Sequence, residues 1–191
     1  MRRDQILQAA AHIFRQKGFH ASSMQAIASA VDLQKATLYH HIASKQEILL
    51  ALLDLALDLL IADLEPIVAS SASPAGKLRQ AMAAYLRRMA DDADLAAVLL
   101  LEYRSLEAPL LAKHVERRDR FEALWRSIID EGIQTGAFRP VDPAMAGFAL
   151  LGVQNWMITW YRPNGRLAPE ELAGLFCDLF LDGLAQEAAP A

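Results

Sequence analysis

The sequence predicts an all-α protein. Apolar residues recur at helical spacing along most of its 191 residues, and no stretch alternates apolar and polar side chains for the length of a strand. Hydrophobic residues make up 54% of the chain and charged residues 22%, which supports a well-filled core. We expect a small head over residues 1–48 and a larger body over residues 49–191, coupled by a helix that begins near residue 44.

The head begins with a helix over residues 3–17. Its inner face is an apolar stripe at spacings i, i+4, i+7 and i+8, formed by Ile6, Ala10, Ile13 and Phe14. Gly18 follows where a helix end needs a left-handed residue, and Phe19 packs after it.

Two short helices come next. Ser22 or Ser23 caps the first of them by accepting a backbone N–H. Asp32 occupies the turn that follows, where a positive φ is easiest for glycine but tolerable for aspartate. The second short helix covers about residues 34–41, with Leu38 as its inward anchor.

Six longer helices are expected after the head. A capping box of Ser44 and Glu47 opens the fourth helix, and Asp142 caps the eighth, with Pro143 at its first position. Prolines also stand at the starts of the fifth, seventh and ninth helices. The expected ranges are 44–66, 74–91, 95–103, 109–132, 143–161 and 169–184.

The stretch over residues 22–45 has the layout of a helix-turn-helix, which places its second short helix in the major groove of DNA. Residues 1–48 carry six Lys and Arg against three Asp and Glu, a net charge of +3, which leaves −7 for the rest of a chain whose total is −4. A basic head on an acidic body is typical of a nucleic-acid-binding module joined to a part that does not bind.

Other classes of protein are disfavoured. A single cysteine, Cys177, gives no intramolecular disulfide, and the N-terminus lacks the apolar core of a signal peptide, so we expect a cytoplasmic protein. The Leu-rich run over residues 48–61 is too short to span a bilayer, and we expect no membrane partner. No glycine-rich phosphate loop, HExxH motif or cysteine pair is present, so we expect no enzyme, metal or cofactor, although a triad assembled in space leaves no such trace.

The head resembles the TetR family of bacterial transcriptional regulators over residues 6–50. The matching residues are Ile6, Ala9, Ala10, Phe14, Gly18 and Phe19, then Ser23, Met24, Ile27 and Ala28, then the run 35–41, then Ser44 and Lys45. Asp32, Gln34, Ala36 and Ile42 stand where the family usually has Gly, Ser, Gly and Phe, which affects only the operator that is read. The resemblance implies a nine-helix fold. A homodimer is expected as well, because one short helix reads few base pairs and two read a palindrome.

The resemblance also implies a DNA-binding surface. Lys35 is the candidate for a base contact, since its ammonium can donate to guanine O6 and N7. Lys45 is expected to clamp a phosphate at the start of the fourth helix. The whole predicted set is Ser23, Gln25, Gln34, Lys35, Ala36, Thr37, Tyr39, His40 and Lys45.

The body has a second resemblance, over residues 155–167, to TetR repressors of lipid or steroid breakdown, several of which respond to acyl-CoA thioesters. It implies a hydrophobic effector, and the candidate walls of its pocket are Leu99, Tyr103, Leu106, Phe121, Trp125, Phe148 and Trp156. The cations Arg117, Arg118 and Arg120 either meet CoA phosphates or lie on a solvated helix face beside acidic partners.

The last two helices resemble the family's dimerisation pair. The candidate interface residues are Trp160, Leu172, Leu175, Phe176, Leu179 and Phe180, with a plain core as the alternative. The predicted function is a ligand-responsive homodimeric repressor that binds a palindromic operator and releases it when a small hydrophobic effector binds. One alternative is an activator or architectural DNA binder that uses no ligand. Another is a carrier or enzyme that uses a pocket in the body.

Overall fold

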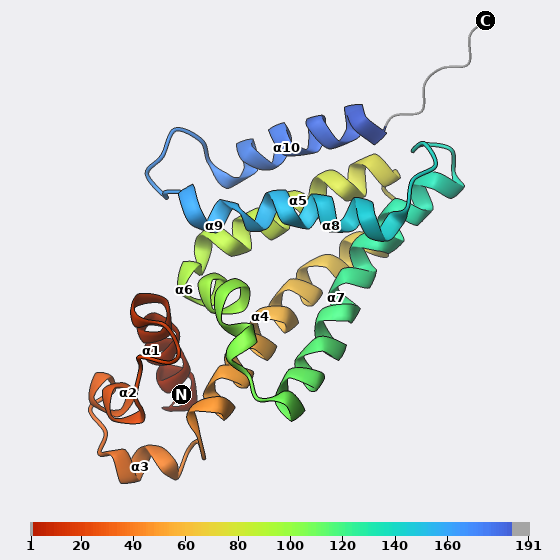
Figure 1. The fold of residues 1–191 in the computed structure, drawn as a ribbon. Coiled ribbons are helices and arrows are strands. Elements are labelled where there is room, and N and C mark those ends of the chain that lie inside the picture. The colour runs from red at the N-terminus through yellow and green to blue at the C-terminus, as the bar shows by residue number, and fades with distance from the viewer. Residues whose placement is uncertain (1, 185–191) are drawn as a thin grey trace, which may run out of the picture. The chain divides into compact units, whose positions relative to one another are not determined.

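The computed structural model describes residues 2–184, which fold into helices joined by short loops (Figure 1). The helices are α1 (Arg2–Lys17), α2 (Met24–Ala30), α3 (Lys35–Tyr39), α4 (Lys45–Val68), α5 (Pro74–Asp91), α6 (Ala93–Ala97), α7 (Ala108–Gln134), α8 (Pro143–Asn155), α9 (Met157–Trp160) and α10 (Pro169–Leu184). A π-helix, η1 (Val98–Glu102), and a 3₁₀-helix, η2 (Tyr103–Ser105), continue α6. The all-α prediction is confirmed.

The described residues form two compact units, the first made of residues 2–58 and 92–118 and the second of residues 59–91 and 119–184. In the first unit α1 packs against α2, α6 and η1, and α2 packs against α3. The core of the head is made by Ile6, Phe14, Ile27 and Leu38, which are fully buried. Burial of side chains of this size stabilises a fold by about 1.5–3 kcal/mol each. Helix α4 runs through residue 48, the boundary expected between head and body, without a break.

The turns of the head have the backbone conformations that the sequence predicts. Gly18 lies at φ +79° directly after α1, and its N–H donates to the carbonyl of Phe14 at 2.8 Å. Asp32 lies at φ +54° after α2. Aspartate tolerates this region better than most side chains, since its short polar group can bond locally. These two residues direct α2 and α3 into a helix-turn-helix.

Side chains cap the helices of the head. Ser23 is the N-cap of α2, where its Oγ accepts from the N–H of Ala26 at 3.1 Å. At the start of α4 the N–H of Glu47 donates to Oγ of Ser44 at 3.0 Å. The Glu47 carboxylate accepts from the N–H of Ala43 at 2.8 Å, one residue before the usual position in a capping box.

In the second unit α10 packs along α5 (Figure 1). A partly buried ion pair joins the ends of three helices. The ammonium of Lys77 lies 2.7 Å from a carboxylate oxygen of Glu131 and donates to the carbonyl of Val68 at 2.9 Å. Lys77 is almost fully buried and Glu131 is partly exposed, so losing Glu131 would leave the ammonium of Lys77 in an apolar environment without a counter-charge. This contact ties the start of α5 to the ends of α4 and α7.

Two helices continue two residues past their expected ends. Helix α4 continues past Pro66 to Val68 and has the proline in its last, exposed turn, where one missing backbone N–H is tolerated. Helix α7 continues past Gly132 to Gln134. Gly132 does not end the helix but makes room for the buried Phe138, because a Cβ added at Gly132 would lie only 2.0 Å from the Phe138 ring.

Two predicted helices change geometry along their length. The expected helix over residues 143–161 is divided at Trp156 into α8 and α9. The carbonyl of Trp156 accepts from both the N–H and the Oγ1 of Thr159, at 3.1 and 2.8 Å, which tightens this turn. The helix after α5 passes from α to π geometry at Val98, so Tyr103 begins a 3₁₀ turn rather than ending an α-helix.

Candidate nucleic-acid interface

The reading helix α3 is held by one buried side chain and presents the others to solvent. Leu38 is fully buried. The exposed residues of this segment are the N-cap residue Gln34 and, on the helix itself, Lys35, Ala36, Tyr39 and His40. Thr37 is half-buried. A five-residue helix with one anchor is thus fixed in place while most of its surface stays accessible.

The polar side chains of α3 are not used inside the molecule. Lys35, Thr37, Tyr39 and His40 form no hydrogen bond or ion pair with any other residue of the described part of the chain. An ammonium, two hydroxyls and an imidazole can therefore meet acceptors on another molecule. Phosphate oxygens and the N7 and O6 atoms of guanine are acceptors of this kind.

Helix α2 adds two exposed polar residues to the surface. Ser23 uses its oxygen as an acceptor in the helix cap, which leaves its hydroxyl proton available to a phosphate. Gln25 makes a long contact of 3.4 Å with Oγ of Ser29, also an exposed residue. Both predicted residues are accessible from outside.

Lys45, predicted to bind a phosphate, forms contacts within the head. Its ammonium donates to the carbonyl oxygens of Phe19 and Ser22 at 2.7 and 2.8 Å, and lies 4.3 Å from the centroid of the Phe19 ring. Partial burial lowers the pKa of Lys45, and the carboxylate of Glu102 opposes this shift. Lys45 thus links the start of α4 to the loop before α2, and because an ammonium carries three donors, the phosphate contact expected at Lys45 stays a prediction.

Other polar contacts hold α1 and α4 within the first unit. Asp94 of α6 pairs with Arg15 at 2.8 Å and with His12 at 2.9 Å. Partial burial alone would raise the pKa of Asp94, but its bonds to Arg15 and His12 outweigh this and lower the pKa. The amide of Gln46 donates to the carbonyl of Ser105 at 2.9 Å and accepts from the N–H of Glu107 at 3.2 Å. The head is thereby joined to the segment that leads into α7.

The residues predicted to line an effector pocket differ in how deeply they are buried. In the first unit Leu99 and Leu106 are buried and Tyr103 is half-buried. In the second unit Phe121 and Trp125 are buried. Phe148 and Trp156 are instead 49% and 66% exposed, so in a single chain they lie on the surface and do not enclose a cavity. The reason is that α8 is apolar on all sides, and periodicity does not distinguish its inner face.

The basic run on α7 is largely engaged in ion pairs. Arg117 bonds to Asp58 and lies 3.2 Å from Asp54, and Arg120 lies 2.5 Å from Glu65. Burial raises the pKa of Asp54, and Arg117 opposes that shift. Of the two readings of this run, the geometry favours a helix face paired with acidic neighbours.

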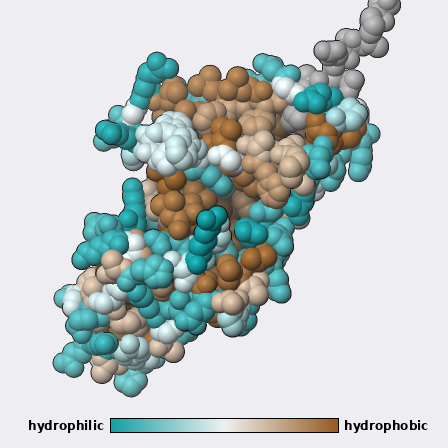
Figure 2. All heavy atoms as spheres, viewed as in Figure 1, coloured by the Kyte–Doolittle hydropathy of each residue, from teal (hydrophilic) through white to brown (hydrophobic). Residues whose placement is uncertain are grey.

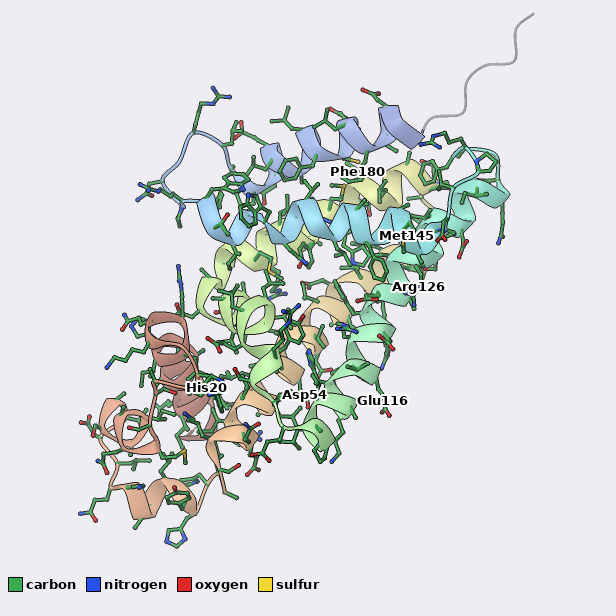
Figure 3. The ribbon with its side chains drawn as sticks, in the orientation of Figure 1. His20, Asp54, Glu116, Arg126, Met145 and Phe180 are labelled. Atoms are coloured by element: carbon green, nitrogen blue, oxygen red, sulfur yellow. The ribbon has the colours of Figure 1, made fainter. Side chains whose placement is uncertain are left out.

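An exposed apolar face covers α8, α9 and α10. Figure 2 shows apolar side chains gathered over this part of the second unit. The exposed residues on it are Met145, Phe148, Val153, Trp156, Trp160, Leu175 and Leu179. Figure 3 shows Met145 on α8 and Phe180 on α10 at one end of this face. Of the predicted interface residues, Leu172 is only 5% exposed and belongs to the core, while Phe176 and Phe180 are half-buried.

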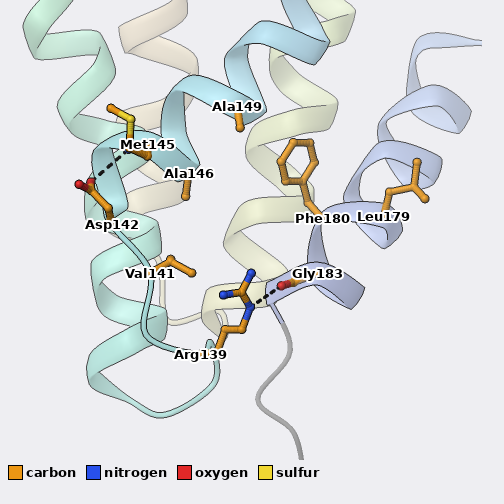
Figure 4. A pocket seen from close by; sticks show the side chains of 9 residues that line it. All are labelled: Arg139, Val141, Asp142, Met145, Ala146, Ala149, Leu179, Phe180 and Gly183. Carbon is orange, nitrogen blue, oxygen red and sulfur yellow. Dashed lines mark hydrogen bonds between the residues drawn. The ribbon is translucent and has the colours of Figure 1, made fainter.

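A groove of about 420 Å³ lies at the same end (Figure 4). Its lining is mostly apolar and includes Met145, Ala149, Leu179 and Phe180. The Nε of Arg139 closes one side by donating to the carbonyl of Gly183 at 2.6 Å. The sequence did not predict this groove, because Arg139 and Gly183 come together only in the fold.

Residues 2–184 contain neither a membrane-spanning helix nor a cluster of metal ligands. None of their helices is long and apolar enough to span a membrane. Nor do three or more His, Cys, Asp or Glu side chains in this range gather as ligands for a metal ion.

Comparisons with known proteins identify the family of this chain. Residues 6–52 match the family model "Bacterial regulatory proteins, tetR family", and residues 71–184 match the model "Tetracyclin repressor-like, C-terminal domain". The chain is 28% identical over 188 residues to the HTH-type transcriptional repressor KstR2 of Mycobacterium tuberculosis, a match that covers 97% of this chain and 94% of that protein.

Two solved structures are similar over nearly the whole chain. The regulator PfmR from Thermus thermophilus is 40% identical, with a TM-score of 0.87 over 95% of this chain and 99% of that one. AibR, solved in complex with isovaleryl coenzyme A and operator DNA, is 29% identical, with a TM-score of 0.85 over 97% and 98%. The chain belongs to the TetR family of bacterial regulatory proteins and is a helix-turn-helix transcriptional regulator.

Proposed function

We propose that this protein is a homodimeric repressor that binds a palindromic operator through α2 and α3 and releases it when a hydrophobic acyl thioester binds. The observation that carries the DNA-binding part is the surface of α3. Lys35, Tyr39 and His40 are exposed and Thr37 is half-buried, and none of these four side chains forms a bond to another of the described residues. In this proposal Lys35 reads a base, and Ser23, Thr37, Tyr39 and His40 bind the phosphate backbone. Gln25 and Gln34 lie beside base edges, and Ala36 lets the helix approach closely.

The exposed apolar face of α8, α9 and α10 supports a dimer. Seven large apolar side chains are exposed between residues 145 and 179, apolar side chains gather over this part of the second unit in Figure 2, and exposed apolar patches mark interaction sites. A second copy of the chain would cover Trp160, Leu175 and Leu179 by a two-fold interface in which each surface meets its own equivalent. The two reading helices would then lie roughly 34–36 Å apart, or a little more, and read two half-sites.

The proposed effector is an acyl-CoA. Aromatic and aliphatic side chains dominate the interior of the second unit, as a site for an acyl chain requires. AibR, which matches this chain along its length, was solved with isovaleryl coenzyme A and operator DNA together. We place the protein in the cytoplasm, where both DNA and acyl-CoA are available.

Release of the operator is proposed to be a population shift. Ligand-free dimers hold the reading helices at operator spacing, and bound effector favours an arrangement in which α4 moves and the spacing no longer fits. The shift is limited by the preference of the effector for one arrangement, typically a coupling of about 1–3 kcal/mol.

Selection of binding sites from a pool of random duplexes tests the DNA-binding part. The wild-type protein is expected to enrich a palindrome, and Lys35→Ala is expected to lose preference at one base pair in each half-site, because a good base contact is worth about 1–3 kcal/mol of discrimination. If Lys35→Ala selects the same palindrome with the same preference, the base contact is assigned to the wrong residue. If the wild-type protein enriches no sequence, the repressor proposal fails and a carrier function gains support.

A further inference from the structure

Polar groups with unused hydrogen-bonding capacity lie among aromatic side chains inside the second unit. Tyr85, Phe121 and Trp125 form a cluster with ring centroids 5.9–6.3 Å apart. All three side chains are buried, and Tyr85 and Trp125 are almost completely so. Polar atoms beside these rings are therefore shielded from bulk water, and they must find partners within the unit or on a ligand.

Two polar atoms in this interior have no hydrogen-bond partner among the described residues. One is the indole N–H of Trp125, which is a donor, and the other is Oε1 of Gln154, which is an acceptor. Both side chains are fully buried. The amide of Gln154 uses its N–H side to donate to the carbonyl of Leu150 at 3.2 Å, so only its oxygen is available.

Contacts link Tyr85 to the ring of Trp125 and to the end of α8, the helix that carries Gln154. The ring of Trp125 meets the Tyr85 ring edge-on at 5.9 Å, and the Tyr85 hydroxyl donates to Oδ1 of Asn155, the residue after Gln154. Helices α7 and α8 also approach next to Trp125, since a Cβ added to Gly147 would lie 3.9 Å from Cγ of Arg126. Figure 3 shows Arg126 close to Met145 at this crossing.

The hydroxyl of Tyr85 stays a donor throughout the physiological range, since burial raises the pKa of this residue well above its usual value. Its bond to Asn155 therefore persists and fixes the end of α8 against α5. The unpartnered donor belongs to Trp125, whose ring contacts Tyr85, and the unpartnered acceptor belongs to Gln154, the neighbour in the chain of the Asn155 that Tyr85 bonds. Apolar walls with a few oriented polar groups are the usual composition of a ligand site.

We propose that the Trp125 N–H and Gln154 Oε1 are the polar recognition points of the effector site, where they bind the thioester carbonyl and the nearest pantetheine amide N–H of an acyl-CoA. The inference rests on the proposed function and assigns its specificity to two residues. A thioester carbonyl is an acceptor and the amide N–H is a donor, and a short ethylene spacer separates them. A free carboxylate carries no proton at neutral pH and has nothing to donate to Gln154. The acid and unacylated CoA are therefore expected to bind more weakly than the thioester.

The test uses the full-length protein and isothermal titration with a series of saturated acyl-CoAs from isovaleryl-CoA to palmitoyl-CoA, their free acids, and CoA alone. The best acyl-CoA is expected to bind the wild-type protein at least about tenfold more tightly than its acid or CoA. Gln154→Leu, which keeps the volume and removes the amide, is expected to lower the affinity for that acyl-CoA by about tenfold. Trp125→Phe, which removes the N–H, is expected to act in the same direction.

The melting temperature distinguishes a role of Gln154 in ligand recognition from a role in the fold. Because Oε1 has no internal partner, Gln154→Leu is expected to melt at or above the wild-type temperature and to bind operator normally without effector. Gln80→Leu, at an exposed position of α5, is the matched control and is expected to change neither affinity nor melting. A Gln154→Leu protein that melts earlier but binds acyl-CoA like the wild type overturns the proposal, because the amide then serves the fold.

The outcomes also separate this inference from the proposed function. If acyl-CoA releases the operator from the wild type and from both variants equally, the proposed function stands and the assignment of Trp125 and Gln154 is wrong. If no acyl-CoA binds the wild type, the effector class and this assignment both fail.

Discussion

Replacing Lys45 with methionine is expected to destabilise the head by about 2 kcal/mol. The ammonium donates to the carbonyls of Phe19 and Ser22 at 2.7 and 2.8 Å, and hydrogen bonds to charged groups contribute about 1.5–3 kcal/mol each. Two facts reduce the total. The carbonyl of Phe19 keeps the hydroxyl of Ser22 at 2.6 Å, and Lys45 is only partly buried, so solvent screens its charge. Methionine retains most of the apolar stem and removes only the ammonium.

Thermal unfolding followed by circular dichroism measures the effect. A loss of about 2 kcal/mol corresponds to a fall in Tm of roughly 4–8 °C for a chain of this length. Lys35→Met is the matched control, because the same charge is removed from an exposed side chain that has no partner among the described residues. It is expected to change stability by less than about 0.5 kcal/mol and to weaken operator binding.

The opposite pattern would refute this reasoning. If Lys45→Met melts like the wild type and lowers the slope of log affinity against log salt by about one, then Lys45 contacts a phosphate, as its place in the sequence first indicated.

Three further predictions concern the remainder of the fold. Leu179→Lys, at a side chain that is 72% exposed, is expected to give a folded monomer in sedimentation, and a persistent dimer would contradict the interface. Glu131→Gln leaves the buried ammonium of Lys77 without its counter-charge and is expected to lower the unfolding free energy in urea by about 2–3 kcal/mol, whereas an unchanged midpoint would show that the ion pair adds nothing. Asp94→Asn is expected to lower the free energy of unfolding by at most about 1 kcal/mol at pH 7. Because pairing with Arg15 lowers the pKa of Asp94, this difference should vanish as the pH falls below 3.8, and a constant difference down to pH 3 would count against the pair.

Local chemistry explains why most of the head could be predicted. Gly18 and Asp32 occupy positive-φ positions, and Ser23 and Ser44 cap helices with their own side chains. Each of these features depends on residues within four positions in the chain. Lys45 differs, because its partners are carbonyl groups 26 and 23 residues earlier, which only the folded head brings to it. The sequence indicated the charge of Lys45 but not its partner.

The body was harder to predict because apolar periodicity has a single meaning only when one face of a helix is polar. Helix α8 is apolar on all sides, so Leu150, which is buried, and Phe148, which is exposed, look equivalent in the sequence. Leu172 and Leu175 on α10 differ in the same way. The unpaired atoms of Trp125 and Gln154 could not be foreseen either, since a missing partner is a property of the fold alone.

Fluorescence anisotropy of a labelled operator duplex, taken from the DNA beside the gene, tests the central claim most directly. The protein is expected to bind with a stoichiometry of two chains per palindrome, and titration with the best acyl-CoA is expected to release the duplex while its free acid does not. A duplex that stays bound at saturating acyl-CoA would contradict an effector-released repressor, and failure to bind any flanking duplex would contradict operator recognition by α3.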